Sequence, residues 1–358
     1  MPSNNNQAIN EFNQQVKPVS LWADAWKRLR KNRMALLGLW IVVIMAAITI
    51  AAPLLPLYDY TKLDLYHSNL PPSFRTAGEV ALSTMQARMD KIQGMIDNGR
   101  KDLQPDLDKV KADYAKVQAD MVTNPAEKRV YLLGTDYLGR DMLARTIYGG
   151  RISMMVGLIG TVTAVLLGIL IGAIAGYTGG RLDNLLMRFV DIMYGLPYML
   201  IVIIMMSMFR KEGASSIVIL FIAIALVSWL DIARVVRGQI ISLKNSEFVE
   251  AARSMGASSG RIIFRHLLPN TLGVIIIFTT LLLPSFIMSE SFLSFLGLGV
   301  SAPDASWGTL VSEGVQAMEL YPWRLLVPAI VMTLFLFAMN FLGDGLRDAL
   351  DPQSKNRA

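Results

Sequence analysis

The sequence predicts an all-α membrane protein with six transmembrane helices, and three observations lead to this fold class. Of the 358 residues, 53% are hydrophobic and 17% are charged, whereas about a quarter of the residues of an ordinary soluble protein are charged. Six separate stretches are apolar over roughly the 20 residues that a helix needs to cross a bilayer. The chain has no cysteine and two histidines, which excludes thiol catalysis and cysteine-based metal sites and leaves little for a histidine-based one.

The apolar stretches divide the chain into parts. The first stretch follows a polar, basic tail and is longer than the core of a signal peptide, so we expect a retained membrane anchor. The other five form a core over 152–342, and a cytoplasmic tail follows at 343–358. The predicted spans are 35–57, 152–177, 189–208, 217–233, 272–289 and 325–342.

Lys and Arg residues predict the orientation of these spans, because short cytoplasmic loops carry an excess of them. With both termini in the cytoplasm, seventeen Lys and Arg residues fall in cytoplasmic segments and three in the two short outer loops. The outer loop 58–151 is longer than the loops to which this rule applies. We therefore expect both termini in the cytoplasm. The formal net charge of +6 is then explained by the excess of Lys and Arg in the cytoplasmic segments, and it does not indicate a nucleic-acid partner.

The cytoplasmic tail 1–34 carries a signal of its own. Apolar residues recur in it at helical spacing between basic residues, which is typical of an amphipathic helix at a membrane surface. A positively charged tail without a helix is the alternative. The apolar residues are Leu21, Trp22, Ala25, Trp26 and Leu29.

The outer loop contains a predicted helical hairpin at 79–123. Apolar residues recur there every three or four positions in two runs, which the turn dipeptide Asn98-Gly99 separates. This spacing predicts two antiparallel helices with a coiled-coil seam. The charges are nearly balanced, which favours a spacer or a dock for an external partner over a catalytic site. The runs are Leu82, Met85, Met89, Ile92 and Ile96, then Leu103, Leu107, Val110, Tyr114, Val117 and Met121.

The cytoplasmic segment 245–269, between the fourth and fifth spans, predicts a short helix. Asn245-Ser246 offers an N-cap at its start. Small residues at Ala251, Ala252 and Gly256 would let this helix approach another protein closely. On these residues alone, a docking helix and an ordinary loop between spans remain open.

The same segment resembles the coupling loop of permeases of ATP-binding-cassette (ABC) importers. The resemblance rests on Glu250-Ala251-Ala252 and Gly256 and, after nine intervening residues, on His266-Leu267-Leu268-Pro269, although an aliphatic residue is usual at His266. Further motifs in matching order resemble oligopeptide and dipeptide permeases of the C-subunit kind. They cover 20–57 loosely and 130–352 closely, and they leave the hairpin outside. These motifs are Gly134-Thr135-Asp136, Gly139-Arg140-Asp141, Gly149-Gly150-Arg151, Gly179-Gly180-Arg181, Gly297-Leu298-Gly299, Ser306-Trp307-Gly308 and Gly343-Asp344-Gly345.

This resemblance implies a permease subunit of a type I ABC importer for peptides, in a bacterial cytoplasmic (inner) membrane. The implied partners are a homologous second permease subunit, two cytoplasmic ATPase subunits that bind ATP and Mg²⁺, and an external peptide-binding protein. Glu250, Ala251, Ala252 and Gly256 would couple the ATPases to a two-state movement of the membrane helices. The resemblance implies no cofactor, metal or catalytic residue in this chain. Nickel or another small solute remains an alternative substrate.

Three acidic residues, Asp191, Asp231 and Glu290, lie within or beside the predicted spans. A charge in contact with lipid is costly, so each is expected to face protein or water. They either line the substrate path or pair with side chains of other helices. Arg188 and Arg234 are the candidate partners of the two aspartates.

Two further groups of residues leave alternatives open. A charged cluster beside the second span contacts a binding protein or forms a local ion-pair network; it comprises Arg140, Asp141, Arg145 and Arg151. A face of small residues within that span packs closely against another helix, in the second permease or in the same chain. Its glycines are Gly168, Gly172 and Gly176.

Other function classes have weaker support. The chain has no Gly-x-x-x-x-Gly-Lys-Ser/Thr loop for ATP, no His-Glu-x-x-His motif and no nucleophile elbow. A stand-alone secondary transporter or channel remains an alternative, although we detect no internal symmetry of the kind that such transporters often show. The remaining alternative is a membrane-anchored scaffold whose working part is the hairpin 79–123.

Overall fold

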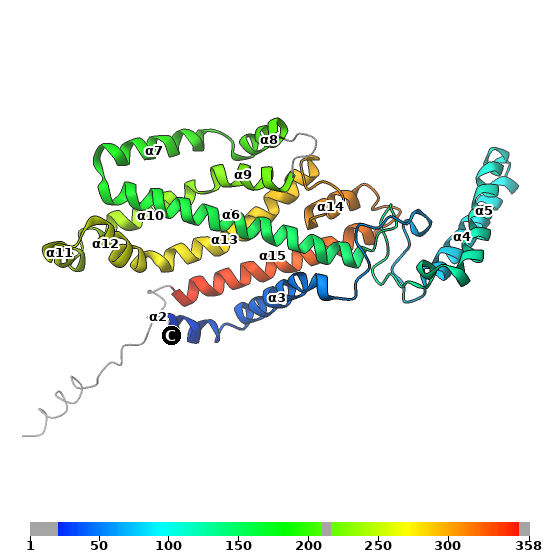
Figure 1. The fold of residues 1–358 in the computed structure, drawn as a ribbon, viewed down its shortest axis with the longest axis horizontal. Coiled ribbons are helices and arrows are strands. Elements are labelled where there is room, and N and C mark those ends of the chain that lie inside the picture. Colours follow the sequence, from blue (N-terminus) through cyan, green and yellow to red (C-terminus); the bar gives the residue numbers. More distant parts are fainter. Residues whose placement is uncertain (1–20, 210–215, 351–358) are drawn as a thin grey trace, which may run out of the picture.

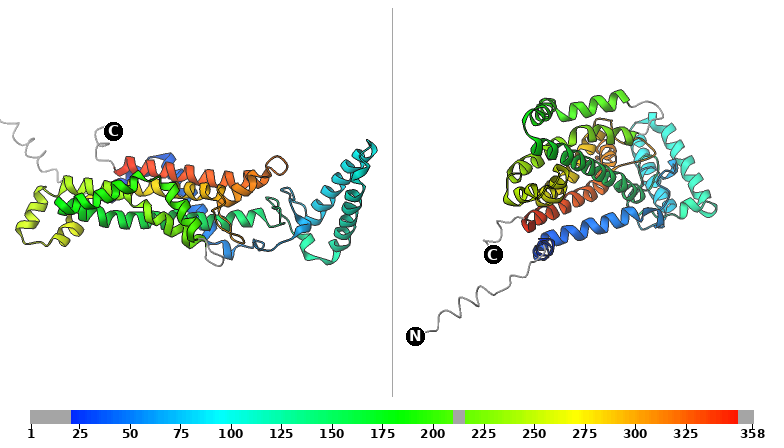
Figure 2. Two further views of the ribbon diagram at one scale, coloured as in Figure 1. Left: turned by 90° about the horizontal axis from the view of Figure 1, so that it is seen from above. Right: turned by 60° about the vertical axis from the view of Figure 1, so that its left-hand side comes forward.

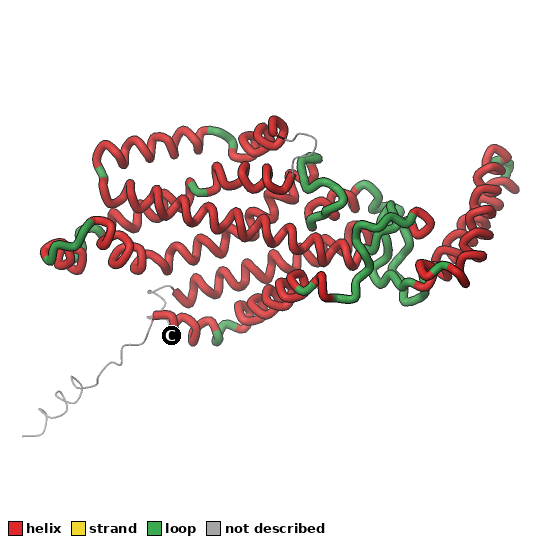
Figure 3. The backbone as a smooth tube through the Cα atoms, viewed as in Figure 1, coloured by secondary structure: helices red, strands yellow, loops and turns green. Residues whose placement is uncertain are grey.

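The computed structural model describes residues 21–209 and 216–350, and the regular elements of these two ranges are helices (Figure 3). The main body contains α2 (Leu21–Leu29), α3 (Arg33–Ile50), α6 (Met142–Thr178), α7 (Gly180–Gly195), α8 (Tyr198–Phe209), α9 (Ser216–Ser228), α10 (Leu230–Leu243), α13 (Leu268–Phe295), α14 (Trp307–Val315) and α15 (Trp323–Leu350). The outer hairpin is α4 (Ala77–Asp97) and α5 (Gln104–Thr123), and α11 (Glu247–Ser254) and α12 (Ser259–Ile262) lie between α10 and α13. A π-helical turn occupies Ile263–Leu267, and 3-10 turns lie at Ala52–Leu54, Leu65–His67, Lys101–Leu103 and Pro125–Lys128.

The long helices lie side by side in an elongated bundle (Figures 1 and 2). Helices α10 and α13 pack along α6, while α3 packs against α15. The hairpin of α4 and α5 projects from one end of the bundle, and α11 and α12 lie at the other (Figure 1). The segments predicted for opposite sides of a membrane are therefore at opposite ends of the molecule.

The described residues include five helical stretches long and apolar enough to cross a membrane, and α7 with α8 makes a sixth if this bent pair is one span. The predicted end of the first span at 57 is wrong. Its helix ends at Ile50, and the chain turns through Ala52–Leu54, where Pro53 has no N–H to continue the helical ladder. Helix α6 begins at Met142, well before the predicted 152, because the Asp141 carboxylate caps it. The five stretches are Arg33–Ile50, Met142–Thr178, Val218–Leu243, Ser259–Phe295 and Trp323–Leu350.

The predicted span at 189–208 is not a continuous helix, whereas most of the predicted span at 217–233 lies within the helical stretch Val218–Leu243. Helix α7 ends at Gly195, and α8 begins at Tyr198 after a bend of 80°. Pro197 explains this break, because the residue before a proline is disfavoured in the helical conformation. Helices α9 and α10 are separated by a one-residue turn at Trp229, whose backbone keeps right-handed helical dihedral angles (φ −80°, ψ −13°) and whose indole N–H donates to the backbone oxygen of Leu226 (2.9 Å).

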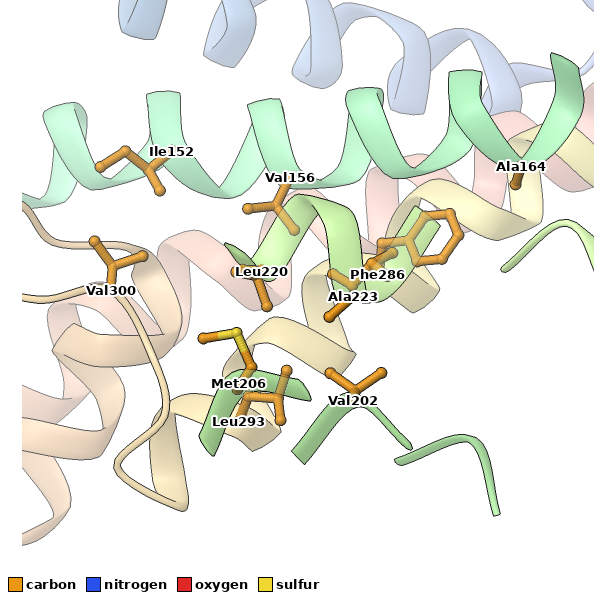
Figure 4. Packing of buried hydrophobic residues seen from close by; sticks show 11 residues of the cluster. Ile152, Val156, Ala164, Val202, Met206, Leu220, Ala223, Phe286, Leu293 and Val300 are labelled. Carbon is orange, nitrogen blue, oxygen red and sulfur yellow. The ribbon is translucent and has the colours of Figure 1, made fainter. Parts of the chain in front are cut away.

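The centre of the bundle is an apolar cluster around α6 (Figure 4). Side chains from α6, α8, α9 and α13 meet there, although these helices are far apart in the sequence. In a membrane, these apolar side chains stabilise contacts between helices mainly through close packing, because lipid is as apolar as the side chains themselves. The labelled residues are Ile152, Val156, Ala164, Val202, Met206, Leu220, Ala223, Phe286, Leu293 and Val300.

The glycine face of α6 packs against α10 of the same chain. A Cβ at Gly172 would lie 2.4 Å from the backbone oxygen of Ala233, and one at Gly168 would lie 2.5 Å from Cβ of Ile232. Gly176 approaches the backbone oxygen of Arg237 in the same way, at 2.8 Å. Of the two alternatives for this face, the structure therefore shows packing within the chain.

The predicted amphipathic helix corresponds to α2. Ala25 and Leu29 are buried with Ala35 of α3 and Ala349 of α15, whereas Trp26 is 46% exposed. One side of α2 thus rests on the end of the bundle and leaves a tryptophan outside.

The outer hairpin has its own small core. Ile92 of α4 packs against Leu107 and Val110 of α5 along the predicted seam. Nearer the bundle, Val80 and Val117 of the two helices join a second apolar cluster that includes Tyr131. The hairpin is thus attached to the loops beside α6 by packing at its root as well as by its connections.

Candidate functional site

Helix α11 is held against the bundle by one face. Val249 and Ala252 are buried (0% and 2% exposed) in a cluster that contains Ile240 of α10 and Ile262 of α12. Ser246 is the N-cap residue, as the sequence predicts for the Asn245-Ser246 pair, but its hydroxyl donates to the Leu243 oxygen (2.6 Å) instead of capping α11.

The other face of α11 is exposed at the end of the bundle. Glu250 and Ala251 lie on it, together with two apolar residues that sequence reasoning missed. Phe248 is 39% exposed and Met255 is 81% exposed. In the sequence, Phe248 lies two residues before the recognised motif Glu250-Ala251-Ala252, and Met255 lies between that motif and Gly256. A short helix with an uncovered apolar face is the geometry of a docking helix.

Gly256 ends α11. No atom lies within 4 Å of where its Cβ would be, so its small size does not serve a close contact within this chain. Its φ of +81° lies in the left-handed region that favours glycine. The N–H of Ala257 donates to the Ala252 oxygen (3.0 Å) across this turn, and Gly256 thereby ends α11.

A cavity of about 360 Å³ lies among α7, α8, α9, α10 and α13. It is bounded by the bend between α7 and α8, by the junction of α9 and α10, and by α13. Its polar groups include the hydroxyls of Tyr194, Tyr198 and Ser228 and the carboxylate of Asp231. Irregular backbone inside a membrane protein is tolerated where it is buried or lines a cavity, and the link between α7 and α8 at Pro197 lines this one.

Asp231 is the predicted acidic residue that lines this cavity, and its partner differs from the predicted one. Its carboxylate accepts a hydrogen bond from the hydroxyl of Tyr194. The guanidinium of Arg234 instead donates to Asp191 (2.6 Å) and lies 3.9 Å from the centre of the Tyr194 ring. The expected pairs of Asp191 with Arg188 and of Asp231 with Arg234 are therefore wrong, because α7 and α10 meet in another register.

The ion pair of Asp191 and Arg234 lies on the surface of the described chain. The two side chains are 59% and 45% exposed. An ion pair that faced hydrocarbon would be costly. Water or another protein must therefore cover this surface in a membrane.

Glu290 does not line the cavity. It is fully buried, and its Oε1 accepts hydrogen bonds from the hydroxyls of Ser294 (2.8 Å) and Ser306 (2.5 Å). Its Oε2 has no partner among the described residues, and a Cβ at Gly308 would lie 2.9 Å from it. Glu290 thus connects α13 to the start of α14, so of its two predicted roles the geometry matches pairing between helices.

The charged cluster on the outer side forms a local network. Asp136 accepts hydrogen bonds from Arg140 (2.7 Å) and Arg145 (2.6 Å), and Arg145 also pairs with Glu313 of α14 (2.8 Å). Both arginines are almost fully buried. Arg151 lies apart, with its guanidinium over the ring of Tyr148. Of the two predicted alternatives, the structure therefore shows the local ion-pair network for Arg140 and Arg145.

Comparison with known proteins gives two matching family models. Residues 168–356 match the binding-protein-dependent transport system inner membrane component, and residues 20–72 match the N-terminal TM domain of oligopeptide transport permease C. An oligopeptide transport system permease protein of Bacillus subtilis is 37% identical over 94% of this chain and 91% of its own length. One of Escherichia coli is 38% identical over 98% of each chain. A solved inward-facing methionine ABC transporter chain has a TM-score of 0.48 at 17% identity, over 59% of this chain and 98% of that one.

Proposed function

Because the chain belongs to the family of binding-protein-dependent transport system inner membrane components, we propose that it is the permease subunit of an ATP-driven importer of oligopeptides or dipeptides. The relatives named for oligopeptide transport span more than nine tenths of this chain, which supports the substrate class. The chain itself is a non-catalytic membrane subunit. It lies in the cytoplasmic (inner) membrane of a bacterium, with both termini in the cytoplasm.

The proposed complex contains a homologous second permease subunit, two cytoplasmic ATPase subunits and an external peptide-binding protein. ATP and Mg²⁺ are bound by the ATPase subunits. The exposed ion pair of Asp191 and Arg234 supports a neighbouring permease subunit or a water-filled path on that face, because lipid would not solvate it. Asp231, in the adjacent cavity, lies on the same path, while Glu290 holds two helices together.

The exposed face of α11 is the observation that carries the coupling mechanism. Phe248 and Met255 offer an apolar surface that a groove on an ATPase subunit would cover, and Glu250 and Ala251 lie on the same face. The opposite face, with Ala252, is packed on the bundle, so movement of a docked ATPase would pass to α10 and α13. Gly256 allows the turn that positions α11.

The test is transport by the reconstituted complex. Proteoliposomes that contain both permeases, the ATPases and the binding protein should accumulate labelled tri-alanine only with ATP. Glu250→Lys and Gly256→Val should reduce uptake and uncouple it from ATP hydrolysis, whereas the complex should still assemble. Uptake by the two permeases without ATPases would show a stand-alone transporter and overturn the proposal.

A further inference from the structure

We propose that the cavity between the α7–α8 bend and the α9–α10 junction is a binding site for the primary ammonium group of a transported peptide, with Asp231 as the acceptor. This inference rests on the proposed function and deepens it. It assigns to the permease chain a preference for a charged group of the substrate, separate from any preference of the external binding protein.

The charge of the cavity favours a cation. Among the described residues that line it, Asp231 is the charged one and none is basic. Arg234, the nearest identified cation, is engaged by the Asp191 carboxylate and lies against the Tyr194 ring.

The hydrogen-bonding capacity of the cavity is partly unused. Among the described residues, the hydroxyl of Ser228 is buried without a partner. The side chain of Ser228 is 8% exposed. A buried hydroxyl without a partner is costly unless a ligand or water satisfies it. The Asp231 carboxylate has several acceptor positions, of which the Tyr194 hydroxyl uses one. An ammonium group, with three donors, matches these acceptors.

The walls of the cavity favour an ammonium group on an organic chain over a bare metal ion. Three aromatic rings line it, those of Tyr194, Tyr198 and Phe286, and such rings attract ammonium groups through their faces. No group of three His, Asp or Glu residues capable of holding a metal occurs in the described ranges. The volume of about 360 Å³ also leaves room for the residue that carries the ammonium group.

Two parts of a peptide carry such a group, the N-terminus and a lysine side chain, and both share this chemistry. The experiment therefore compares three peptides in proteoliposomes with the complete transporter. They are tri-alanine, N-acetyl-tri-alanine and N-acetyl-Ala-Lys-Ala. The binding protein is the same for wild type and variants, so its own preference cancels when each variant is divided by wild type for the same peptide.

Asp231→Asn should reduce the initial uptake of tri-alanine about tenfold or more relative to wild type and leave the N-acetyl-tri-alanine rate relative to wild type unchanged. If a lysine ammonium also binds, the N-acetyl-Ala-Lys-Ala rate falls as well; if only the N-terminus binds, it does not. Asp231→Glu should restore most of the preference. Asp344→Asn, which changes an exposed carboxylate on α15, is the matched control.

If the Asp231→Asn complex does not assemble, Tyr194→Phe tests the ammonium site instead. This variant removes the hydroxyl donor that competes with an ammonium group for Asp231. It should therefore maintain or increase the preference for tri-alanine over N-acetyl-tri-alanine.

An equal reduction by Asp231→Asn for all three peptides, or no reduction for any, would overturn the proposed subsite. So would uptake that depends on Na⁺ through Asp231, measured by replacing Na⁺ with N-methylglucamine. Failure of the wild-type complex to take up any peptide with ATP would contradict the proposed function itself, so the two failures are distinguishable.

Discussion

Nε2 of His67 lies 2.9 Å from Oε2 of Glu127 at the root of the outer hairpin. Its Nδ1 lies 2.9 Å from Oδ2 of Asp64, and the ring is fully buried. Glu127 lies in the 3-10 turn Pro125–Lys128 after α5, whereas the N–H of Asp64 donates to the Leu138 oxygen (2.9 Å) near the start of α6. The imidazole therefore joins the hairpin to the segment that leads into the bundle. With a carboxylate at each ring nitrogen, the imidazolium form donates two hydrogen bonds.

We expect the root of the hairpin to open more often as the pH rises above about 6.5. Burial lowers the pKa of His67, but the hydrogen bonds and charges of Asp64 and Glu127 outweigh burial and raise it. A raised pKa stabilises the fold below the unfolded value of about 6.5, and this contribution is lost as the pH passes the folded value. Hydrogen exchange of the amides at 78–80 and 126–128, measured from pH 6 to 9 in the intact protein, checks this.

The control for this pH dependence is His67→Gln, which keeps hydrogen-bonding groups but does not titrate. It should remove the pH dependence of opening in this range. At low pH, stability instead decreases as the pH falls. Burial raises the pKa of Asp64, but the hydrogen bond to His67 outweighs burial and lowers this pKa. The contribution of Asp64 is thus lost as the pH falls through its lowered value. An unchanged slope between pH 6 and 9 in His67→Gln would contradict the role of the histidine.

Gly139→Ala is expected to destabilise the outer region by about 3 kcal/mol or more. Its φ is +74°, and a Cβ there would lie 1.8 Å from the Asp64 oxygen, which is backbone and cannot rotate away. Gly94→Ala in α4 is the matched control, because open space surrounds it and alanine should stabilise a helix by about 0.5–1 kcal/mol. Thermal unfolding of the two variants should shift in opposite directions. Equal shifts would mean that the contact between Gly139 and Asp64 is absent.

Gly172→Ala should weaken the packing of α6 on α10 by about 1–3 kcal/mol, because its Cβ would meet the backbone oxygen of Ala233. Gly273→Ala in α13, with nothing within 4 Å, should be tolerated. Denaturant-induced unfolding of the detergent-solubilised chain measures both. If Gly172→Ala instead leaves the chain stable and releases a second permease subunit, the glycine face is a contact between subunits.

Met255→Asp should abolish capture of the ATPase subunits while the chain remains folded. The side chain is 81% exposed, and surface substitutions usually change stability by less than about 0.5 kcal/mol. Val249→Asp on the buried face of the same helix should unfold α11, because it buries a charge without a partner. Co-purification with the ATPases, together with thermal unfolding, separates the two effects. Normal capture by Met255→Asp would show that α11 docks through another face.

Elements governed by local patterns could be predicted from the sequence. Apolar length indicates the spans that became α3, α6, α13 and α15, and the three-to-four spacing predicts the helices of the hairpin. The helix α11 follows from residues that are neighbours in the chain. The break at Pro197 was missed, since a hydropathy pattern remains apolar across a break.

Contacts between distant residues depended on the tertiary structure. The sequence alone determined that this chain is a multi-span helical permease, because bilayer length, helical period and family motifs are all written along the chain. The relative register and orientation of the helices decided that Asp231 meets Tyr194, that Asp191 meets Arg234, that Gly172 packs on α10, and that His67 bridges Asp64 and Glu127. The physical reason is that side chains at these positions interact through space, and packing of all the helices together sets which ones meet.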